Sequence, residues 1–476
     1  MYMVNILRYN LAKIAGKAGI HIVKLGSGEG NSFPGLVFLK IGGFESLKAL
    51  SNELDIGSIL VTGTNGKTTT TTLLTRLLSN DIDIRQSYEN NTVNAVTTAL
   101  LKGNSDMGVF EYGIRDIKHG IPVEIQESIN PIGVVYTTIS REHTQVLGVK
   151  NSFKDYIKAK TLLSEGMKEG VIITNGDDPR TTGIGLEKEK DVHVNYYGIE
   201  VDEIDDIFDA IPAKCPFCDE ELEYEHVYMN HRGRYHCPSC GFKRPTPNVA
   251  LTNIIFNNDN WVLEIKGNLY NYLVSKDISF EVTLTVPPFG YHNIYNTLCS
   301  ITAYASFTPT PEKIESTCKK VFDNLDMSFI PPGRFEVIEV GDKIVGLGQG
   351  DNGDALRINV SYMDQYIEDS VEFIYTTPDV GEEEVFHDHM EAIRCIKPDH
   401  LIVVPGRESV EIAEKYYNEI TDEFNVDFIG INLEMDERTS KLEDLVRNSD
   451  YDHIIMSGCG EEQLMWETVK RKLSKD

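Results

Sequence analysis

One short stretch, VTGTNGKTTTTTLL from residue 61 to 74, has the residue types of a phosphate-binding loop. An apolar run typical of a strand ends at Gly63, and Lys67 opens a stretch typical of a helix. Amides at a helix N-terminus bind anions, the lysine would reach terminal phosphates, and the Thr68 hydroxyl would bind Mg²⁺. Val61 stands where the common G-x-x-x-x-G-K-[ST] pattern has its first glycine. The residues predicted to bind a nucleotide here are Gly63, Thr64, Asn65, Gly66, Lys67, Thr68 and Thr69.

Four of the eight cysteines lie within 26 residues: Cys215, Cys218, Cys237 and Cys240. They form two C-x2-C pairs separated by 18 residues, which is the spacing of a zinc ribbon. Four thiolates fill a tetrahedral zinc site and leave no open position for catalysis. The cluster therefore predicts a structural Zn²⁺ that holds a small insertion together.

The elements around these motifs alternate between apolar strands and amphipathic helices. Strand-like runs such as GSILVTG, MGVFEYG and GVIITNG are separated by helical stretches, a pattern that predicts a mostly parallel sheet. A helical stripe over 3–20 is followed by the breaking segment GSGEGNSFPG and by a helix at about 44–54. Beyond PPGRFE, a second series of strands predicts a smaller sheet domain. We predict an α/β fold: a central P-loop ATPase domain with a parallel sheet and an inserted zinc ribbon, then a C-terminal Rossmann-like α/β domain.

These patterns suggest three parts of the chain. Residues 1–54 form a short N-terminal region, and residues 55–328 form the central ATP-binding domain with the ribbon insertion at 211–247. Residues 329–476 form the C-terminal domain. The length of 476 residues is ample for several buried cores.

The composition restricts the partners. Lys and Arg total 45 against 74 Asp and Glu, a formal net charge of -29, which repels polyanions at long range. We therefore expect no nucleic acid and no membrane as a partner, although a local basic pocket would still bind a small phosphorylated molecule. Because no run of 18 apolar residues and no secretory leader pattern is found, we expect a cytoplasmic protein.

The short loop G-T-N-G-K-T-T resembles that of the Mur ligase superfamily, which includes folylpolyglutamate synthetases. The resemblance implies that Glu111 in FEYGIRD and His143 in TTISREHTQ bind Mg²⁺ with Thr68. It also implies that Lys160 in YIKAKTLL is carbamoylated and serves as a further metal ligand. The family's common Asp-His pair is Glu142-His143 here. Lys67, Glu111, His143 and Lys160 are thus the implied catalytic residues.

The resemblance continues through about residue 465. GYHNIYN is similar to the family's adenine-contacting G-x-H-N-x-x-N, which implies nucleotide contacts from His292, Asn293 and Asn296. PPGRFE resembles the family's inter-domain linker and adds Arg334. GDNGDAL resembles a shortened family motif in which Asp351 is the nucleotide-side carboxylate, although the family's histidine is missing.

A zinc ribbon inside the central domain resembles the branch that contains MurT and the pseudomurein peptide ligases of methanogens. MurT-type proteins carry a tryptophan-rich motif that we do not find, since the chain's two tryptophans are Trp261 and Trp466. The resemblance therefore favours an ATP-dependent, ADP-forming ligase that adds an amino acid to a nucleotide-linked cell-wall peptide. The alternatives are a synthetase that amidates a precursor with ammonia from a glutaminase partner, a folylpolyglutamate-type ligase, and a nucleic-acid-binding ribbon protein. The sequence does not identify the amine, the acceptor or the oligomeric state.

Overall fold

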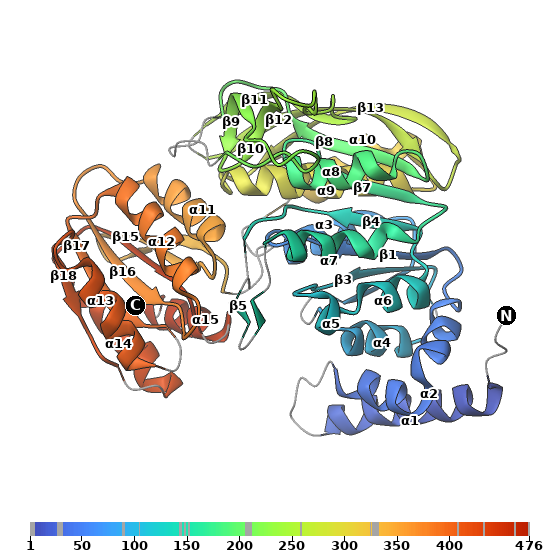
Figure 1. Ribbon diagram of the computed structural model, residues 1–476, viewed down its shortest axis with the longest axis horizontal. Coiled ribbons are helices and arrows are strands. Elements are labelled where there is room, and N and C mark those ends of the chain that lie inside the picture. Colours follow the sequence, from blue (N-terminus) through green and yellow to red (C-terminus); the bar gives the residue numbers. More distant parts are fainter. Residues whose placement is uncertain are drawn as a thin grey trace. The chain divides into compact units, whose positions relative to one another are not determined.

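In the computed structural model the chain forms two compact units (Figure 1). Unit 1 comprises Met1–Ile139, Asn151–Ile204 and Pro212–Phe329, and unit 2 comprises Ser140–Lys150, Asp205–Ile211 and Ile330–Asp476. Within these units, the described residues are 5–25, 32–87, 91–103, 105–141, 145–146, 149–150, 153–204, 212–257, 259–323, 325, 333–406, 409–431, 434–460 and 463–474.

Unit 1 is built on a nine-stranded sheet, counted over the described residues, with the order β13-β12-β11-β8-β7-β4-β1-β3-β2. The seven strands from β2 to β11 run parallel, and β12 and β13 continue the sheet as an antiparallel hairpin. The strands are β1 (Gly57–Thr62), β2 (Ile84–Ser87), β3 (Met107–Glu111), β4 (Gly133–Tyr136), β7 (Val171–Asn175), β8 (His193–Ile199), β11 (Val249–Phe256), β12 (Trp261–Asn271) and β13 (Lys276–Val286). The central strands are buried except for Gly57 at the start of β1, as expected for a parallel sheet with helices on both faces.

Helices of unit 1 connect these strands and cover the sheet (Figure 1). They are α1 (Ile6–Leu25), α2 (Phe33–Ser51), α3 (Lys67–Leu78), α4 (Val93–Leu101), α5 (Ile117–Gly120), α6 (Pro122–Ile129), α7 (Phe153–Glu165), α8 (Pro179–Lys188), α9 (Tyr291–Phe307), the 3-10 turn η1 (Pro311–Lys313) and α10 (Ile314–Phe322). Helix α9 is buried along almost its whole length, so it acts as a core helix that packs against α3 and β8.

Helix α2 differs from the sequence prediction. It begins at Phe33 rather than near residue 44, because Pro34 occupies the first helical turn, where its missing N–H costs nothing. The Gly42-Gly43 pair lies inside the helix, which is kinked there with Gly43 at φ 69°. The earlier part of the predicted break, residues 26–31, lies outside the described residues.

The insertion between β8 and β11 carries the cysteines. Its strands β9 (Glu223–Met229) and β10 (Arg232–His236) form a separate antiparallel hairpin. A small core of its own contains Ala213, Leu222, Tyr235 and Phe242 together with Cys215 and Cys237. The insertion is therefore a distinct small module attached to the larger sheet.

Unit 2 contains a six-stranded sheet of order β14-β15-β19-β16-β17-β18, again counted over the described residues. All its strands run parallel except β14, which forms a hairpin with β15. The strands are β14 (Glu336–Val340), β15 (Lys343–Gln349), β16 (Val371–Thr377), β17 (His400–Pro405), β18 (Val426–Phe428) and β19 (His453–Gly458). The helices are α11 (Gly353–Asp364), α12 (Glu383–Ile396), α13 (Val410–Ile420), α14 (Met435–Asn448) and α15 (Gln463–Leu473). The short pair β5 (Gln145–Val146) and β6 (Val149–Lys150) forms a separate two-stranded ribbon.

The predicted α/β class, with sheets dominated by parallel pairing, is confirmed. Two hydrophobic cores of unit 2 pack on opposite sides of its sheet, as in other doubly wound folds. Among the described helices, none is both long enough and apolar enough to cross a lipid bilayer.

Gly348 near the end of β15 should be essential for the stability of unit 2. Its φ is 154°, and a Cβ at this position would lie 2.3 Å from Phe335 Cα, which is backbone and cannot move aside. We expect Gly348→Ala to lower the free energy of unfolding by at least about 2 kcal/mol. In contrast, Gly341→Ala should cost about 1 kcal/mol, because Gly341 also has a positive φ but has open space around it.

The measurement is denaturant unfolding followed by tryptophan fluorescence in a Trp261→Phe background. Trp466 is then the single reporter, and it is buried in unit 2. Equal midpoints for the two glycine variants would contradict the close contact with Phe335.

Candidate active site and metal centre

The loop between β1 and α3 is held by hydrogen bonds to the segment that follows β4. The Thr64 amide donates to Thr138 O at 2.6 Å, and the Thr137 hydroxyl donates to Asn65 O at 2.6 Å. Lys67 is the first residue of α3, and its Nζ donates across the loop to Thr64 O at 2.6 Å. The predicted phosphate loop is thus a tight, pre-ordered turn at the carboxyl edge of the sheet.

Glycine is required at two positions of this loop. Gly63 has φ 152°, and a Cβ there would lie 2.0 Å from Thr137 Oγ1. Gly66 has φ 83°, and a Cβ there would lie 2.4 Å from Asn296 Oδ1 on α9. The loop therefore approaches two other segments so closely that no side chain fits between them.

The threonine run of α3 is stabilised locally. Thr71 and Thr72 donate their hydroxyls to Lys67 O and Thr68 O one turn earlier, at 2.8 and 2.9 Å. These hydrogen bonds give both hydroxyls a partner within the helix, although a run of threonines has a low intrinsic propensity to form a helix. The amides of the first turn of α3 lack partners within the helix, and Thr68 and Thr69 are buried there. The helix N-terminus consequently offers N–H donors and a hydroxyl that suit a phosphate and its cation.

Glu111 lies at the end of β3, next to the end of β1. It pairs in register with Val61, and its side chain is 3% exposed. Oε1 accepts a 3.4 Å hydrogen bond from Asn91 Nδ2, whereas Oε2 has no hydrogen-bond partner within the described part of the chain. A buried carboxylate oxygen without a donor is costly unless a cation binds to it. The position therefore fits the chemistry of a Mg²⁺ ligand.

Lys160 of α7 is 1% exposed and contacts the same loop. Its Nζ donates to Gly63 O at 3.0 Å and to Ile114 O at 3.2 Å. It also lies 4.5 Å from the ring centre of Tyr156, whose hydroxyl is 3.0 Å from Thr64 Oγ1. The side chain is thus placed beside the phosphate loop, and its carbamoylation stays a prediction.

The predicted adenine-contacting residues lie in the first turns of α9. Asn293 donates Nδ2 to Phe289 O at 2.7 Å, and Asn296 donates Nδ2 to Asn293 Oδ1 at 2.8 Å. Asn296 Oδ1 in turn lies 3.5 Å from Thr70 Oγ1 on α3. His292 precedes them and is half-buried. The two asparagines therefore join α9 to the helix that follows the loop.

The remaining predicted residues belong to other parts of the chain. His143 and its neighbours at 142–144 lie outside the described residues. Arg334 and Asp351 belong to unit 2. Arg334 is half-buried just before β14, and Asp351 follows β15 and accepts a hydrogen bond from Gln349 Nε2. Their roles at a nucleotide stay predictions.

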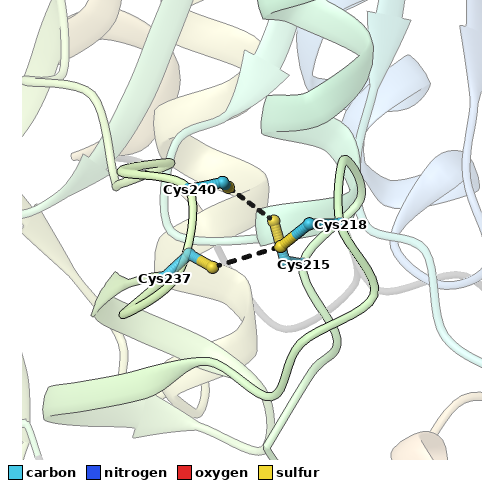
Figure 2. Close-up of side chains that lie close together, drawn as sticks. All are labelled: Cys215, Cys218, Cys237 and Cys240. Carbon is cyan, nitrogen blue, oxygen red and sulfur yellow. Dashed lines mark hydrogen bonds between the residues drawn. The ribbon is translucent and has the colours of Figure 1, made fainter.

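The four predicted zinc ligands converge on one point (Figure 2). Cys215 and Cys240 approach to 3.5 Å between their sulfurs, as do Cys218 and Cys237, and all four sulfurs lie within 4.8 Å of one another. Tetrahedral zinc with Zn–S bonds of about 2.3 Å places its sulfurs about 3.8 Å apart. The four side chains therefore fit one Zn²⁺, and a set of four thiolates would leave it without an open position.

Backbone hydrogen bonds shape both cysteine loops. The Cys215 amide donates to Glu220 O at 2.7 Å, and the Cys237 amide donates to Phe242 O at 2.6 Å. The ring of Phe242 also lies 5.3 Å from that of Phe217, so the two loops contact each other beside the sulfurs. The sulfurs are thus positioned by the loops themselves as well as by any bound metal.

Asp178 begins α8 at this edge of the sheet and is fully buried. It accepts hydrogen bonds from Thr138 Oγ1 at 2.9 Å, from the Ile139 amide at 2.8 Å and from the Arg180 amide at 2.9 Å. Burial acts to raise the pKa of its carboxyl, but His231, Arg180 and the donors outweigh burial and hold that pKa below its usual range. In the sequence Asp178 belongs to NGDDP, residues 175–179, and these five residues alone do not indicate its partners.

Arg232 of the ribbon hairpin reaches the same edge. It is 3% exposed, donates Nη1 to Thr138 Oγ1 at 3.2 Å, and lies over the ring of Tyr295. The neighbouring His231 lies 3.4 Å from the Asp178 carboxylate. Arg244, on the other side of the cysteines, binds the buried Asp177 at 2.6 Å. The basic residues His231, Arg232 and Arg244, which flank the second cysteine pair, are therefore directed into unit 1.

Metal analysis of the purified chain should find about one zinc per molecule. Cys237→Ser should lose that zinc and lower the thermal midpoint, because the buried core of the ribbon depends on the ligand set. Cys395→Ser is the matched control, since Cys395 is exposed and lies far along the chain in α12. A zinc-free chain with an unchanged thermal midpoint would contradict the metal centre.

Residues 61–226 match the family model of the Mur ligase middle domain. Among curated relatives, subunit MurT of the glutamine-hydrolyzing lipid II isoglutaminyl synthase of Staphylococcus aureus is 26% identical over 289 residues. That alignment covers 58% of this chain and 62% of the relative, so the chain spans about 62% of the length of the relative it matches.

Two solved structures share the fold. A pseudomurein peptide ligase type C from Methanothermus fervidus aligns with a TM-score of 0.66 and 23% identity, covering 90% of this chain and 80% of the other. The MurF ligase of Thermotoga maritima, solved with ADP, aligns with a TM-score of 0.60 and 13% identity. The alignment covers 91% of this chain and 83% of the MurF chain. Residues 61–226 are thus identified as a Mur ligase middle domain, and over most of its length the chain shares the fold of these Mur ligases.

Proposed function

We propose that the chain is an ATP-dependent, ADP-forming ligase that joins an amine to a carboxyl group of a cell-wall precursor peptide. The preferred form of the reaction adds an amino acid to a nucleotide-linked pseudomurein precursor. In this proposal residues 55–328 form the ATP-binding domain, and residues 329–476 form the C-terminal domain.

One observation carries the proposal. Four side chains from four elements meet at the loop between β1 and α3: Lys67 at its end, Lys160 bonded to Gly63 O, Glu111 beside Val61, and Asn296 against Gly66. A helix N-terminus, a lysine, a buried carboxylate with an open oxygen and an amide from another helix suit a nucleoside triphosphate with its cation. This is the set of groups that phosphoryl transfer requires.

The chemistry follows from the charges. A carboxylate of the acceptor peptide attacks the γ-phosphorus of ATP, and the bond between that phosphorus and the β,γ-bridging oxygen breaks to release ADP. The amine then attacks the carbonyl carbon of the resulting acyl phosphate, loses a proton and expels inorganic phosphate. Mg²⁺ bound by Glu111 and Thr68 would neutralise the charge that two anions bring together. Lys67 would stabilise the charge on the transferred phosphoryl group.

The names of two similar proteins point to different amines as the second substrate. The name of the Methanothermus fervidus protein describes a peptide ligase, and the name of the Staphylococcus aureus relative describes a subunit of a glutamine-hydrolyzing synthase. The sequence similarity to MurT keeps amidation with ammonia from a glutaminase partner as the second candidate. Because the chain lacks the tryptophan-rich motif expected of MurT, we favour the peptide ligase.

The nucleic-acid alternative is less well supported. Arg232 and His231 are buried, and Arg244 is paired with Asp177 and Glu200, so these side chains are directed inward. A ribbon that binds phosphodiesters needs exposed basic side chains. The folylpolyglutamate alternative shares the nucleotide chemistry and is distinguished by substrate.

Lys67→Ala should abolish substrate-dependent ADP release, with a loss of at least about 100-fold, because the terminal phosphate loses its positive partner. The assay contains Mg·ATP and a panel of nucleotide-linked peptides, each with single amino acids, ammonia or glutamine. Nucleotide affinity is measured in parallel by calorimetry and should also fall. Turnover only with ammonia, or with glutamine and a second protein, would select the amidating candidate. Undiminished turnover by Lys67→Ala would reject the nucleotide site.

Lys160→Ala should reduce turnover by at least about 100-fold, and added bicarbonate should not restore it. The matched control is Lys158→Ala, which removes an exposed lysine from the same helix and should retain activity. Mass spectrometry of the native chain in bicarbonate should show the added carbamate on Lys160. Full activity of Lys160→Ala, with thermal midpoints equal to those of Lys158→Ala, would contradict its role.

A further inference from the structure

Helix α1 exposes an apolar face along its length. Leu7, Leu11, Ile14 and Ile22 are 70%, 53%, 67% and 62% exposed. Their spacing places them on one side of the helix, and we call this set the α1 outer face. Four large apolar side chains in one row are more than the scattered exposure that soluble surfaces usually show.

The opposite side of α1 explains why this face is exposed. Ala12 and Gly16 are buried there, and a Cβ at Gly16 would lie within 3.3 Å of side-chain atoms of Leu101 and Phe38. These small residues bring α1 close to α2 and α4, at the margin of unit 1 (Figure 1). The helix is therefore anchored by its small side, and its larger apolar residues remain in solvent.

The charge of α1 differs from that of the chain. Residues 5–25 contain Arg8, Lys13, Lys17 and Lys24 and no acidic residue, although the formal net charge of the chain is -29. Lys13 is paired with Glu53, whereas Arg8, Lys17 and Lys24 are exposed. An apolar row beside exposed basic residues is typical of helices that lie in the interface of an anionic bilayer. We propose that the α1 outer face docks on an anionic lipid surface.

The charges favour lipid over a second copy of the chain. Two α1 helices packed through their outer faces would bring like-charged lysines together without an acid on either helix, which is unfavourable. Anionic headgroups neutralise the same lysines while the acyl boundary covers the apolar row. The acidic remainder of the chain repels the surface, but this repulsion is screened beyond the Debye length of about 10 Å, so binding should be reversible and composition-dependent.

This docking is independent of the proposed ligase activity, because α1 contains none of the residues placed at the nucleotide. The test is co-sedimentation of the full chain with vesicles. Vesicles of phosphatidylcholine with about one third phosphatidylglycerol should bind the chain, and vesicles of pure phosphatidylcholine should bind it at least about tenfold less. Absence of binding to the anionic vesicles would overturn the proposal.

Two sets of substitutions in α1 test whether the α1 outer face is the surface that binds vesicles. Leu7→Gln/Leu11→Gln/Ile14→Gln should weaken vesicle binding at least about tenfold, since each substitution removes an apolar side chain from the interface. Lys17→Glu/Lys24→Glu should abolish the preference for anionic vesicles without changing the apolar row. Equal binding by either variant would contradict docking through α1.

The matched control is Ile117→Gln/Ile255→Gln/Val380→Gln, which changes three exposed apolar residues elsewhere and should bind like the wild-type chain. Thermal midpoints show whether the variants fold. If the α1 triple variant is destabilised, vesicle binding by Lys17→Glu/Lys24→Glu tests whether α1 is the docking surface. Sedimentation velocity tests the alternative that a second copy of the chain covers the α1 outer face. A dimer that the α1 triple variant converts to monomer, without vesicle binding by the wild type, would assign the face to a second copy.

Discussion

The close approach of three chain segments at the carboxyl edge of the large sheet is the constraint on which the candidate site depends. Gly63 lies against Thr137, and Gly66 lies against Asn296, at distances that exclude any side chain. Parallel pairing of β1 with both β3 and β4 brings the ends of these strands together. As a consequence the loop cannot move away from α9 or from the segment after β4 without losing its hydrogen bonds. The N-terminus of α3, which follows β1, and Glu111, at the end of β3, therefore lie at the ends of neighbouring parallel strands.

The insertion that carries the four cysteines is coupled to the same edge through buried charges. Arg232 and Asp178 both bond to the hydroxyl of Thr138, and the Thr138 carbonyl accepts from the Thr64 amide of the phosphate loop. Buried charges of this kind destabilise a fold when one partner is removed, because the other is left uncompensated. A ribbon that lost its metal and its internal order would withdraw Arg232 from this network. A Zn²⁺ held by the four cysteines would therefore have a physical route to the candidate nucleotide site.

Much of this organisation follows from local sequence, and the remainder depends on contacts that local sequence does not contain. Strand and helix alternation predicted both sheets, and the C-x2-C spacing predicted the convergence of four sulfurs, because each signal lies within a short segment. The predicted start of α2 near residue 44 is wrong, because the helix begins at Phe33 and continues through a kink at Gly43. The inward direction of Arg232 could not be predicted, because it is set by the register of the β9-β10 hairpin and by its docking on Tyr295. Asp178 was visible as part of NGDDP, but its partners Thr138 and His231 come from residues 40 or more positions away.

The distribution of basic residues shows why an average charge is a poor guide to partners. The ribbon is rich in arginine and histidine, yet Arg232, His231 and Arg244 are used within unit 1. Helix α1 holds fewer cations, but Lys17 and Lys24 are exposed and have no acid within their own helix. Electrostatic attraction at physiological ionic strength acts over about 8 Å, so a surface responds to the charges nearest to it rather than to the sum over 476 residues. The same chain can therefore reject polyanions in general and still present one helix that an anionic surface attracts.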